Sequence, residues 1–329
     1  MAKHALVTGA AGFIGSTLSE RLLAGGLRVT GVDCFTDYYD IRLKRANVQA
    51  ALKHPQYQLF ELDLGAADLG ALPDVDVVFH QAAQAGVRAS WGKDFAAYAH
   101  HNVLATQRLL ERYQKTALER FVYASSSSVY GDAEKYPTDE ALLPRPFSPY
   151  GVTKLAAEHL VLLYGRNFGM NVAALRYFTV YGPRQRPDMA FHKFCKAMLQ
   201  GDEIAVYGDG RQSRDFTFIS DAIEANVRAW ARATPQAVYN IGGGSQVDVL
   251  ETIAILEQAL GVKARLRFEP RPPGDPLRTR ADATRLKTDL DYATQVGIEA
   301  GLHAQAQWAK GLYGSNAGNN AGGNAGSQA

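Results

Sequence analysis

The chain has 329 residues, which is enough to bury one large core or two smaller ones. Apolar residues make up 47% and charged residues 21%, and the net charge is only +2. This balance is typical of a globular protein and gives no sign of the basic surface that nucleic-acid binding needs, so we expect no nucleic-acid partner.

Membrane insertion and secretion are also disfavoured. No apolar run reaches the roughly 18 residues of a membrane-spanning helix, so we expect no membrane partner. The N-terminal segment is interrupted by glycines and lacks a cleavage pattern. The chain contains two cysteines, Cys34 and Cys195, which is typical of reduced thiols in a cytoplasmic protein.

Short apolar, β-branched runs alternate with longer segments of helical periodicity. Strands are predicted at 4–8, 27–33, 57–62, 76–80, 120–125 and 171–178, and helices at 14–26, 99–114 and 150–167. Such alternation indicates βαβ units whose parallel strands are covered by helices on both faces. The sequence therefore predicts an α/β fold with a doubly wound, Rossmann-type parallel sheet.

The regular alternation weakens after residue 180, where proline and arginine cluster in "YGPRQRPDM" and "EPRPPGDPLRTR". We interpret residues 1–180, plus about 215–245, as the Rossmann domain. Residues 181–214 and 246–313 are interpreted as a smaller C-terminal region with substrate-binding loops. Residues 314–329 have no apolar periodicity and are predicted to form a disordered tail.

The stretch "VTGAAGFIGS" places Gly9, Gly12 and Gly15 between the first strand and the first helix. Glycine is needed there if the backbone approaches a pyrophosphate at the helix N-terminus, although a tight turn alone would also use it. Asp33 ends the second strand, where a carboxylate binds the adenosine ribose and repels a 2′-phosphate. This favours NAD over NADP, with a plain turn residue as the alternative.

Further cofactor contacts are expected where the third and fourth strands end. Asp63 follows the third strand and is a weaker candidate for the adenine. The stretch "HQAAQAG" ends the fourth strand with small residues against which a cofactor can pack. Its first residue, His80, is interpreted as a structural histidine.

Tyr150 and Lys154 lie one helical turn apart in "SPYGVTK", behind a predicted cap at Ser148 and Pro149. A Tyr–Lys pair is common on helices, so its meaning depends on its surroundings. A phenol has a pKa of about 10, which is too high for a base near neutral pH. We expect the Lys154 ammonium and a nicotinamide to lower it.

Four serines follow the fifth strand in "ASSSSVYG", Ser125 to Ser128. Serine tracts are usually solvated linkers. The strand-like flanks of this tract argue instead for a place at the edge of the sheet.

Together, "TGAAGFIG", "ASSSSVYG", "SPYGVTK" and "LRYFTVYGP" resemble the extended short-chain dehydrogenase/reductase family, in particular its nucleotide-sugar epimerases and dehydratases. The resemblance implies NAD as cofactor, a UDP-sugar as substrate, no metal ion, and a homodimer formed through helices near 94–114 and 150–167. It implies Tyr150, Lys154 and Ser126 as catalytic residues. The implied cofactor contacts are Gly9, Gly12, Phe13, Ile14, Gly15, Asp33, Asp63, Leu64, Ala82, Ala83, Gln84, Tyr150, Lys154 and Tyr177.

The residues after Ser126 bear on the reaction. Dehydratases of this family carry an Asp-Glu pair where this chain has Ser127 and Ser128, which leaves reversible oxidation at sugar carbon 4. The stretches "DCFTDYYD", "QAGVRAS" and "YGPRQRPDM" resemble UDP-glucuronate 4-epimerases, which form UDP-galacturonate. UDP-glucose 4-epimerases usually have Asn where this chain has Thr179. The alternatives are that enzyme, a UDP-glucuronate decarboxylase and a non-catalytic NAD-sensing protein.

A uronic acid brings a carboxylate, which hydroxyl donors can bind without charge repulsion. We expect Ser127, Ser128 and Thr179 to hold it, with added charge from Arg186. Ser128 could instead only cap the strand, and Arg186 could bind the diphosphate or be solvated. The resemblance further implies substrate contacts from Ser126, Tyr150, Arg88, Arg214 and Asp275.

Overall fold

The structure is a computed structural model, and it describes residues 2–133, 135–270 and 278–314. Asp275 and residues 315–329 of the predicted tail lie outside the described residues. None of the described helices is both long and apolar enough to cross a membrane.

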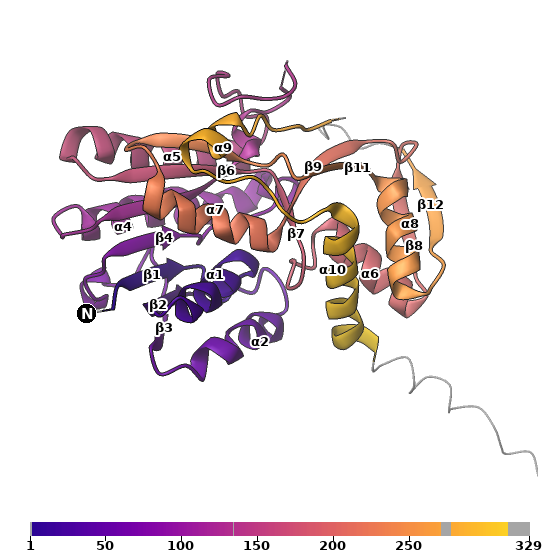
Figure 1. The fold of residues 1–329 in the computed structure, drawn as a ribbon, viewed down its shortest axis with the longest axis horizontal. Helices are drawn as coiled ribbons and strands as arrows, with labels where there is room; N and C mark the ends of the chain where they lie inside the picture. The colour runs from indigo at the N-terminus through magenta and orange to yellow at the C-terminus, as the bar shows by residue number, and fades with distance from the viewer. Residues whose placement is uncertain (1, 134, 271–277, 315–329) are drawn as a thin grey trace, which may run out of the picture.

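A seven-stranded parallel sheet forms the centre of the fold (Figure 1), in the order β10-β6-β5-β4-β1-β2-β3. The strands are β1 (His4–Thr8), β2 (Arg28–Asp33), β3 (Tyr57–Glu61), β4 (Val77–His80), β5 (Arg120–Ser126), β6 (Val172–Tyr177) and β10 (Ala237–Ile241). The first six match the predicted strands, and the predicted doubly wound α/β fold is confirmed.

Alternate residues of each strand pack on opposite faces of this sheet. Val7 and Phe79 contribute to the core beneath one set of helices, whereas Leu6 and Val78 contribute to the core on the other side. The first set contains α1 (Phe13–Ala24), α2 (Ile41–Leu52), α7 (Ile219–Arg232) and α9 (Thr284–Asp289). The second contains α4 (Ala105–Tyr113) and α5 (Pro149–Phe168).

The helix α2 has no counterpart among the predicted helices. Its buried face contains Lys44 and Asn47 beside Val48 and Ala51, so the apolar periodicity that marks a helix is missing from its sequence.

A further hydrophobic core, separate from the two that cover the faces of the sheet, lies on the side of the sheet where β6 ends, at the right of Figure 1. Its helices are α6 (Ala190–Gln200), α8 (Val249–Leu260) and α10 (Ile298–Tyr313). They pack with a three-stranded sheet of β7 (Thr179–Tyr181), β9 (Ser213–Phe218) and β11 (Ser245–Asp248), and with the pair β8 (Glu203–Tyr207) and β12 (Arg265–Glu269).

The strands of a parallel sheet all end at one edge, which is where α/β proteins bind their ligands. The glycine turn follows β1, Asp33 ends β2, and the serine tract begins in β5. The topology therefore brings the sequence motifs to one side of the molecule.

Candidate active site

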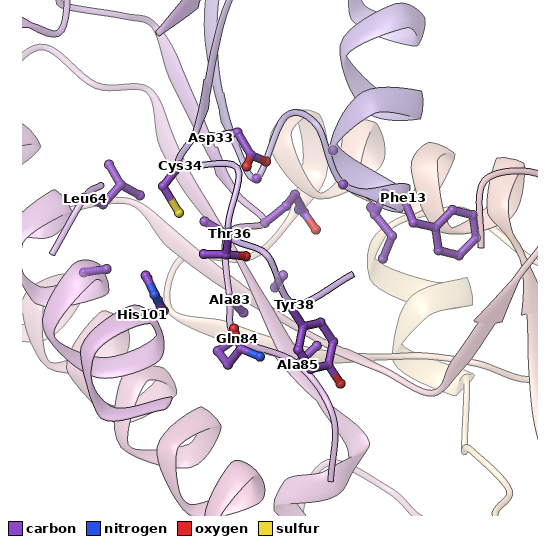
Figure 2. Close-up of a pocket in the computed structure, with 18 of the residues that line it drawn as sticks. Phe13, Asp33, Cys34, Thr36, Tyr38, Leu64, Ala83, Gln84, Ala85 and His101 are labelled. Atoms are coloured by element: carbon purple, nitrogen blue, oxygen red, sulfur yellow. The ribbon is translucent and has the colours of Figure 1, made fainter. Parts of the chain in front are cut away.

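A cavity opens at the carboxyl ends of the parallel strands (Figure 2). Its empty volume is about 1160 Å³, including the part open to solvent. It is lined by residues from the first turn of α1, the loops after β2 and β4, the ends of β5 and β6, and α5. The predicted cofactor residues that line it are Gly9, Gly12, Phe13, Ile14, Gly15, Asp33, Leu64, Ala82, Ala83, Gln84, Tyr150, Lys154 and Tyr177.

The glycine turn is packed too tightly for side chains. Gly9 has a φ of +65°, and a Cβ built on it would lie 2.9 Å from the backbone of Ala82. A Cβ on Gly15 would lie 2.1 Å from the Gly9 carbonyl oxygen. The turn therefore exposes bare backbone at the N-terminus of α1, a surface suited to a pyrophosphate.

The Asp33 carboxylate is oriented by the backbone around it. It accepts hydrogen bonds from the amides of Ala11 (3.0 Å) and Phe35 (2.8 Å). Asp33 therefore ends β2, orients the segment that follows it, and lines the cavity with its half-buried side chain.

Asp63 is placed differently from the other predicted cofactor residues. It is not among the lining residues, whereas its neighbours Leu62 and Leu64 are. Its carboxylate accepts hydrogen bonds from the Gly65 amide and from His100, both at 2.8 Å. Its contact with an adenine stays a prediction.

His80 has the structural role expected for it. The ring is fully buried and hydrogen-bonded to Thr8 (2.7 Å) and Thr106 (2.9 Å). Burial lowers the pKa of His80 to about 3, so the ring stays neutral near neutral pH.

Asn102 is a positioning residue that the sequence reasoning missed. Its side chain accepts a hydrogen bond from the Gln84 amide (2.7 Å) and donates to the hydroxyl of Thr153 (3.0 Å). It thereby joins the loop after β4 to the first turns of α5. The one signal in the sequence was that Asn102 falls in the apolar periodic positions of the predicted helix at 99–114.

The first turn of α5 presents Tyr150 and Lys154 to the cavity. As predicted, Ser148 caps this helix by accepting from the Gly151 amide (3.1 Å), and Pro149 occupies its first turn. A Cβ on Gly151 would lie 2.5 Å from the Ser128 carbonyl oxygen. The serine tract therefore packs directly against the turn that carries Tyr150.

Burial dominates the electrostatics of this pair. It raises the pKa of Tyr150, while a hydrogen bond from Ser126 and the charge of Arg186 oppose the rise. Burial also lowers the pKa of Lys154 to about 7, against the charge of Glu158. The lowering of the phenol pKa that we expect from the Lys154 ammonium together with a nicotinamide stays a prediction.

The four serines form no linker. The Ser125 hydroxyl donates to Glu158 at 2.6 Å, and Ser125 itself lines the cavity. Ser126 ends β5, and its side chain caps a short 3₁₀ turn, η5 (Ser127–Val129), by accepting from the Ser128 amide (3.1 Å). Ser127 and Ser128 are half-buried in that turn.

Glu158 and Arg176 form a buried ion pair below these residues. Their side chains are 1% and 5% exposed, and two hydrogen bonds of 2.6 and 3.0 Å join them. Arg176 also donates to the Tyr130 hydroxyl (2.8 Å). The pair therefore connects α5 to β6, while Ser125 connects the same carboxylate to β5.

The residues predicted to bind the carboxylate follow the ends of two neighbouring strands. Ser126 of β5 lies opposite Tyr177 of β6 in the parallel register. The turn with Ser127 and Ser128 thus follows β5 where Thr179, at the start of β7, follows β6. The described residues give no direct contact among these three hydroxyls.

Arg186 lines the cavity and is paired, so the alternative of a merely solvated guanidinium is wrong. Its Nε and Nη2 donate to the two carboxylate oxygens of Asp188, each at 2.9 Å. Two other predicted arginines lie outside the lining. Arg214 on β9 donates to the Ser213 carbonyl (3.1 Å), and the Arg88 guanidinium carbon lies 5.1 Å from the Tyr207 ring centroid.

Comparison with known proteins supports a family assignment. The model of the NAD dependent epimerase/dehydratase family matches residues 5–242. A Bacillus subtilis protein named as an uncharacterized UDP-glucose epimerase, YtcB, is 42% identical over 313 residues, which cover 94% of this chain and 98% of that protein. A UDP-glucuronate 4-epimerase of Thermodesulfobacterium geofontis is 35% identical, covering 93% and 95%.

A solved structure is similar over nearly the same span. The crystal structure of UDP-glucuronic acid 4-epimerase from Bacillus cereus, in complex with UDP-glucuronic acid and NAD, has a TM-score of 0.90 and 44% sequence identity. The match covers 94% of this chain and 100% of that one.

We expect Glu158→Gln to destabilise the fold, because it leaves the buried Arg176 cation without a carboxylate. The loss should be about 3–5 kcal/mol in denaturant-induced unfolding. The control is Glu257→Gln, which removes a surface ion pair with Lys263 and should cost about 1 kcal/mol or less. Equal losses of unfolding free energy in the two variants would show that the buried ion pair stabilises the fold no more than the surface pair does.

Proposed function

The chain belongs to the NAD dependent epimerase/dehydratase family, and on that premise we propose that it is a UDP-glucuronate 4-epimerase. It converts UDP-glucuronate to UDP-galacturonate through a transient 4-keto sugar. The observation that carries this proposal is that Tyr150 and Lys154, one turn apart on α5, both line a cavity that begins at the glycine turn, next to the strand end that carries Ser126.

The cavity fits NAD. Its glycine turn packs closely on its own backbone and leaves the N-terminus of α1 free of side chains for a pyrophosphate, and the Asp33 carboxylate suits a ribose hydroxyl while it repels a 2′-phosphate. Bound in this cavity, NAD would supply the redox chemistry, as acceptor and then donor of the hydride at sugar carbon 4.

Tyr150 moves the matching proton. It accepts the proton of the sugar 4-hydroxyl during oxidation and returns it during reduction, so no net redox change occurs. Ser126 hydrogen-bonds the phenol, and Arg186 favours its ionised form. Lys154, with its pKa near 7, gains charge most easily when the phenol beside it becomes an anion.

Dehydration lacks the necessary acid. Among the described residues that line the cavity, Asp33 is the one carboxylate, and it belongs to the loop after β2 rather than to the serine tract. The tract offers Ser127 and Ser128, whose hydroxyls are weak acids and do not protonate a leaving hydroxyl group.

We assign the uronate carboxylate to Ser127, Ser128 and Thr179, with Arg186 nearby. The adjacent ends of β5 and β6 support this grouping. A second candidate, a UDP-glucose/UDP-galactose 4-epimerase, is favoured by one observation. Asp188 already neutralises Arg186, which leaves less positive charge for a carboxylate.

A cytoplasmic location is part of the proposal. Both cysteines are free thiols, Cys195 buried and Cys34 exposed. An exposed free thiol beside the cofactor cavity suits a reducing compartment.

We also propose a homodimer, formed through the surface that the helical segments 95–107 and 152–160 share. This face is hollowed and lined by Phe95, Ala99, Val103, Leu104, Gln107, Val152, Thr153, Ala156 and Leu160. Phe95, Leu104 and Val152 are 42%, 44% and 49% exposed, which is unusual for a cluster of large apolar side chains on a monomer.

The first test incubates the purified protein, without added NAD, with UDP-glucuronate, UDP-glucose and UDP-galactose in turn. We expect UDP-galacturonate from UDP-glucuronate and much slower turnover of the neutral sugars. Tyr150→Phe should reduce turnover to below about 1%, because it removes the proton acceptor. It should still retain NAD, because it removes little packing. Products are separated chromatographically, and NAD is measured in the heat-released supernatant.

Three results would contradict the epimerase proposal. NADH that accumulates with product would indicate a dehydrogenase, and CO2 in amounts matching the substrate consumed would indicate a decarboxylase. Substantial residual activity in Tyr150→Phe would remove this residue from the proton-transfer role.

The carboxylate assignment predicts a change in selectivity. A charge-assisted hydrogen bond contributes about 1.5–3 kcal/mol. Ser127→Ala and Thr179→Ala should therefore lower kcat/KM for UDP-glucuronate relative to UDP-glucose by roughly ten- to hundredfold. The control is Thr288→Ala, an exposed threonine on α9. A wild-type preference for neutral UDP-sugars would exclude a carboxylate site.

The dimer proposal predicts that Leu104→Glu yields a monomer, because it places a charge in the apolar face. Leu266→Glu is the matched control, since Leu266 is 38% exposed on the distant strand β12. Size-exclusion chromatography with light scattering measures both masses. A wild-type monomer, or a dimer that persists in Leu104→Glu, would refute this interface.

A further inference from the structure

Asp63, His100 and His101 form a compact cluster beside the cofactor cavity. One nitrogen or oxygen from each side chain lies within 4.8 Å of the other two. His100 Nε2 is 2.8 Å from one carboxylate oxygen of Asp63, and His101 Nδ1 is 3.9 Å from the other. The two imidazole rings stand nearly perpendicular, with centroids 4.8 Å apart.

The local backbone explains how two adjacent histidines reach one carboxylate. Neighbouring side chains on an α-helix diverge by about 100°. His100 and His101 lie instead in a π-helical segment, η4 (Ala99–Leu104), whose wider turn reduces that divergence. Asp63 is fixed from the other side, because its carboxylate also accepts the Gly65 amide at 2.8 Å.

A metal ion binds an imidazole through an unprotonated nitrogen and a carboxyl group in its ionised form. At this cluster it would take the place of the proton shared between His100 Nε2 and the Asp63 carboxylate, which already lie 2.8 Å apart.

We propose that Asp63, His100 and His101 form a binding site for a divalent transition-metal ion of the Zn²⁺ type. Two imidazole nitrogens and one carboxylate oxygen suit Zn²⁺ and its first-row neighbours, whereas Mg²⁺ prefers an all-oxygen shell. The three side chains are 21–35% exposed, so the remaining positions are open to water.

Other groups around the cluster limit its affinity. The Lys44 ammonium, which donates to the Thr36 carbonyl (2.7 Å), faces His101 and opposes a cation. Cys34 lines the same cavity, but its sulfur is not part of the cluster. We therefore infer a site that exchanges its metal rather than a permanent structural centre.

Occupation of this site changes one wall of the cofactor cavity. His101 lines the cavity, and Figure 2 shows it in the same space as Cys34 and Leu64. A metal bound by Asp63 withdraws the carboxylate from any adenine. Metal binding therefore weakens NAD retention. This consequence rests on the proposed function, whereas the metal site itself does not.

The test titrates CoCl2 into the purified full-length protein and follows the visible absorption of bound Co²⁺. We expect saturation near one ion per chain, displacement of Co²⁺ by ZnCl2, and no displacement by MgCl2. His100→Gln and His101→Gln should each weaken binding by at least about tenfold, since even outer-shell partners have effects of that size. His303→Gln, an exposed histidine on α10, is the matched control, and Cys34→Ser should bind as the wild type does.

Circular dichroism checks that each variant is folded. If His100→Gln and His101→Gln both bind Co²⁺ as tightly as the wild type does, the proposed site is refuted. It is also refuted if Mg²⁺ displaces Co²⁺ as well as Zn²⁺ does. For the coupling, NAD released into the filtrate is measured after ZnCl2 addition, and release should occur in the wild type but not in His100→Gln. Co²⁺ binding without NAD release would overturn the coupling alone. A protein that never binds NAD would contradict the proposed function, while the Co²⁺ titration would still decide on the site.

Discussion

The arrangement of the site depends on one buried carboxylate, that of Glu158. It accepts hydrogen bonds from Ser125 of β5 and from Arg176 of β6, while it belongs to α5 itself. A buried charge is costly unless it is fully paired, so this constellation tolerates few other relative positions of the three elements. The Ser126 hydroxyl and the Tyr150 phenol come from two of those elements. The position of Ser126 relative to Tyr150 is therefore set by a contact that involves neither residue.

The serine tract shows how a low-complexity sequence can have several separate roles. Ser125 donates to the buried carboxylate, while Ser126 caps a turn and opposes the rise in the pKa of Tyr150. Ser127 and Ser128 lie in the turn that packs on Gly151. A strand end followed immediately by a 3₁₀ turn makes this division possible, because successive side chains then point in different directions.

The motifs and the sheet could be predicted from the sequence because they depend on local patterns. Apolar alternation marks the strands, and Ser148 with Pro149 marks the start of α5. Other features have no such pattern. Asn102 contacts the distant residues Gln84 and Thr153, and Arg186 pairs with Asp188, two residues away in a turn without periodicity. The helix α2 was missed because Lys44 is buried, although burial of a lysine is rare.

The pKa of Tyr150 also depends on packing that local sequence patterns do not show. Sequence shows that a lysine is near the phenol, but it does not show that both are desolvated, and burial disfavours the charged form of each group. An epimerase benefits from this balance. Tyr150 has to accept a proton in one half of the reaction and return it in the other, so a phenol held permanently ionised would fail in the second half. Burial stabilises the protonated phenol, whereas Ser126 and Arg186 limit the rise in its pKa, so that the proton can still be removed.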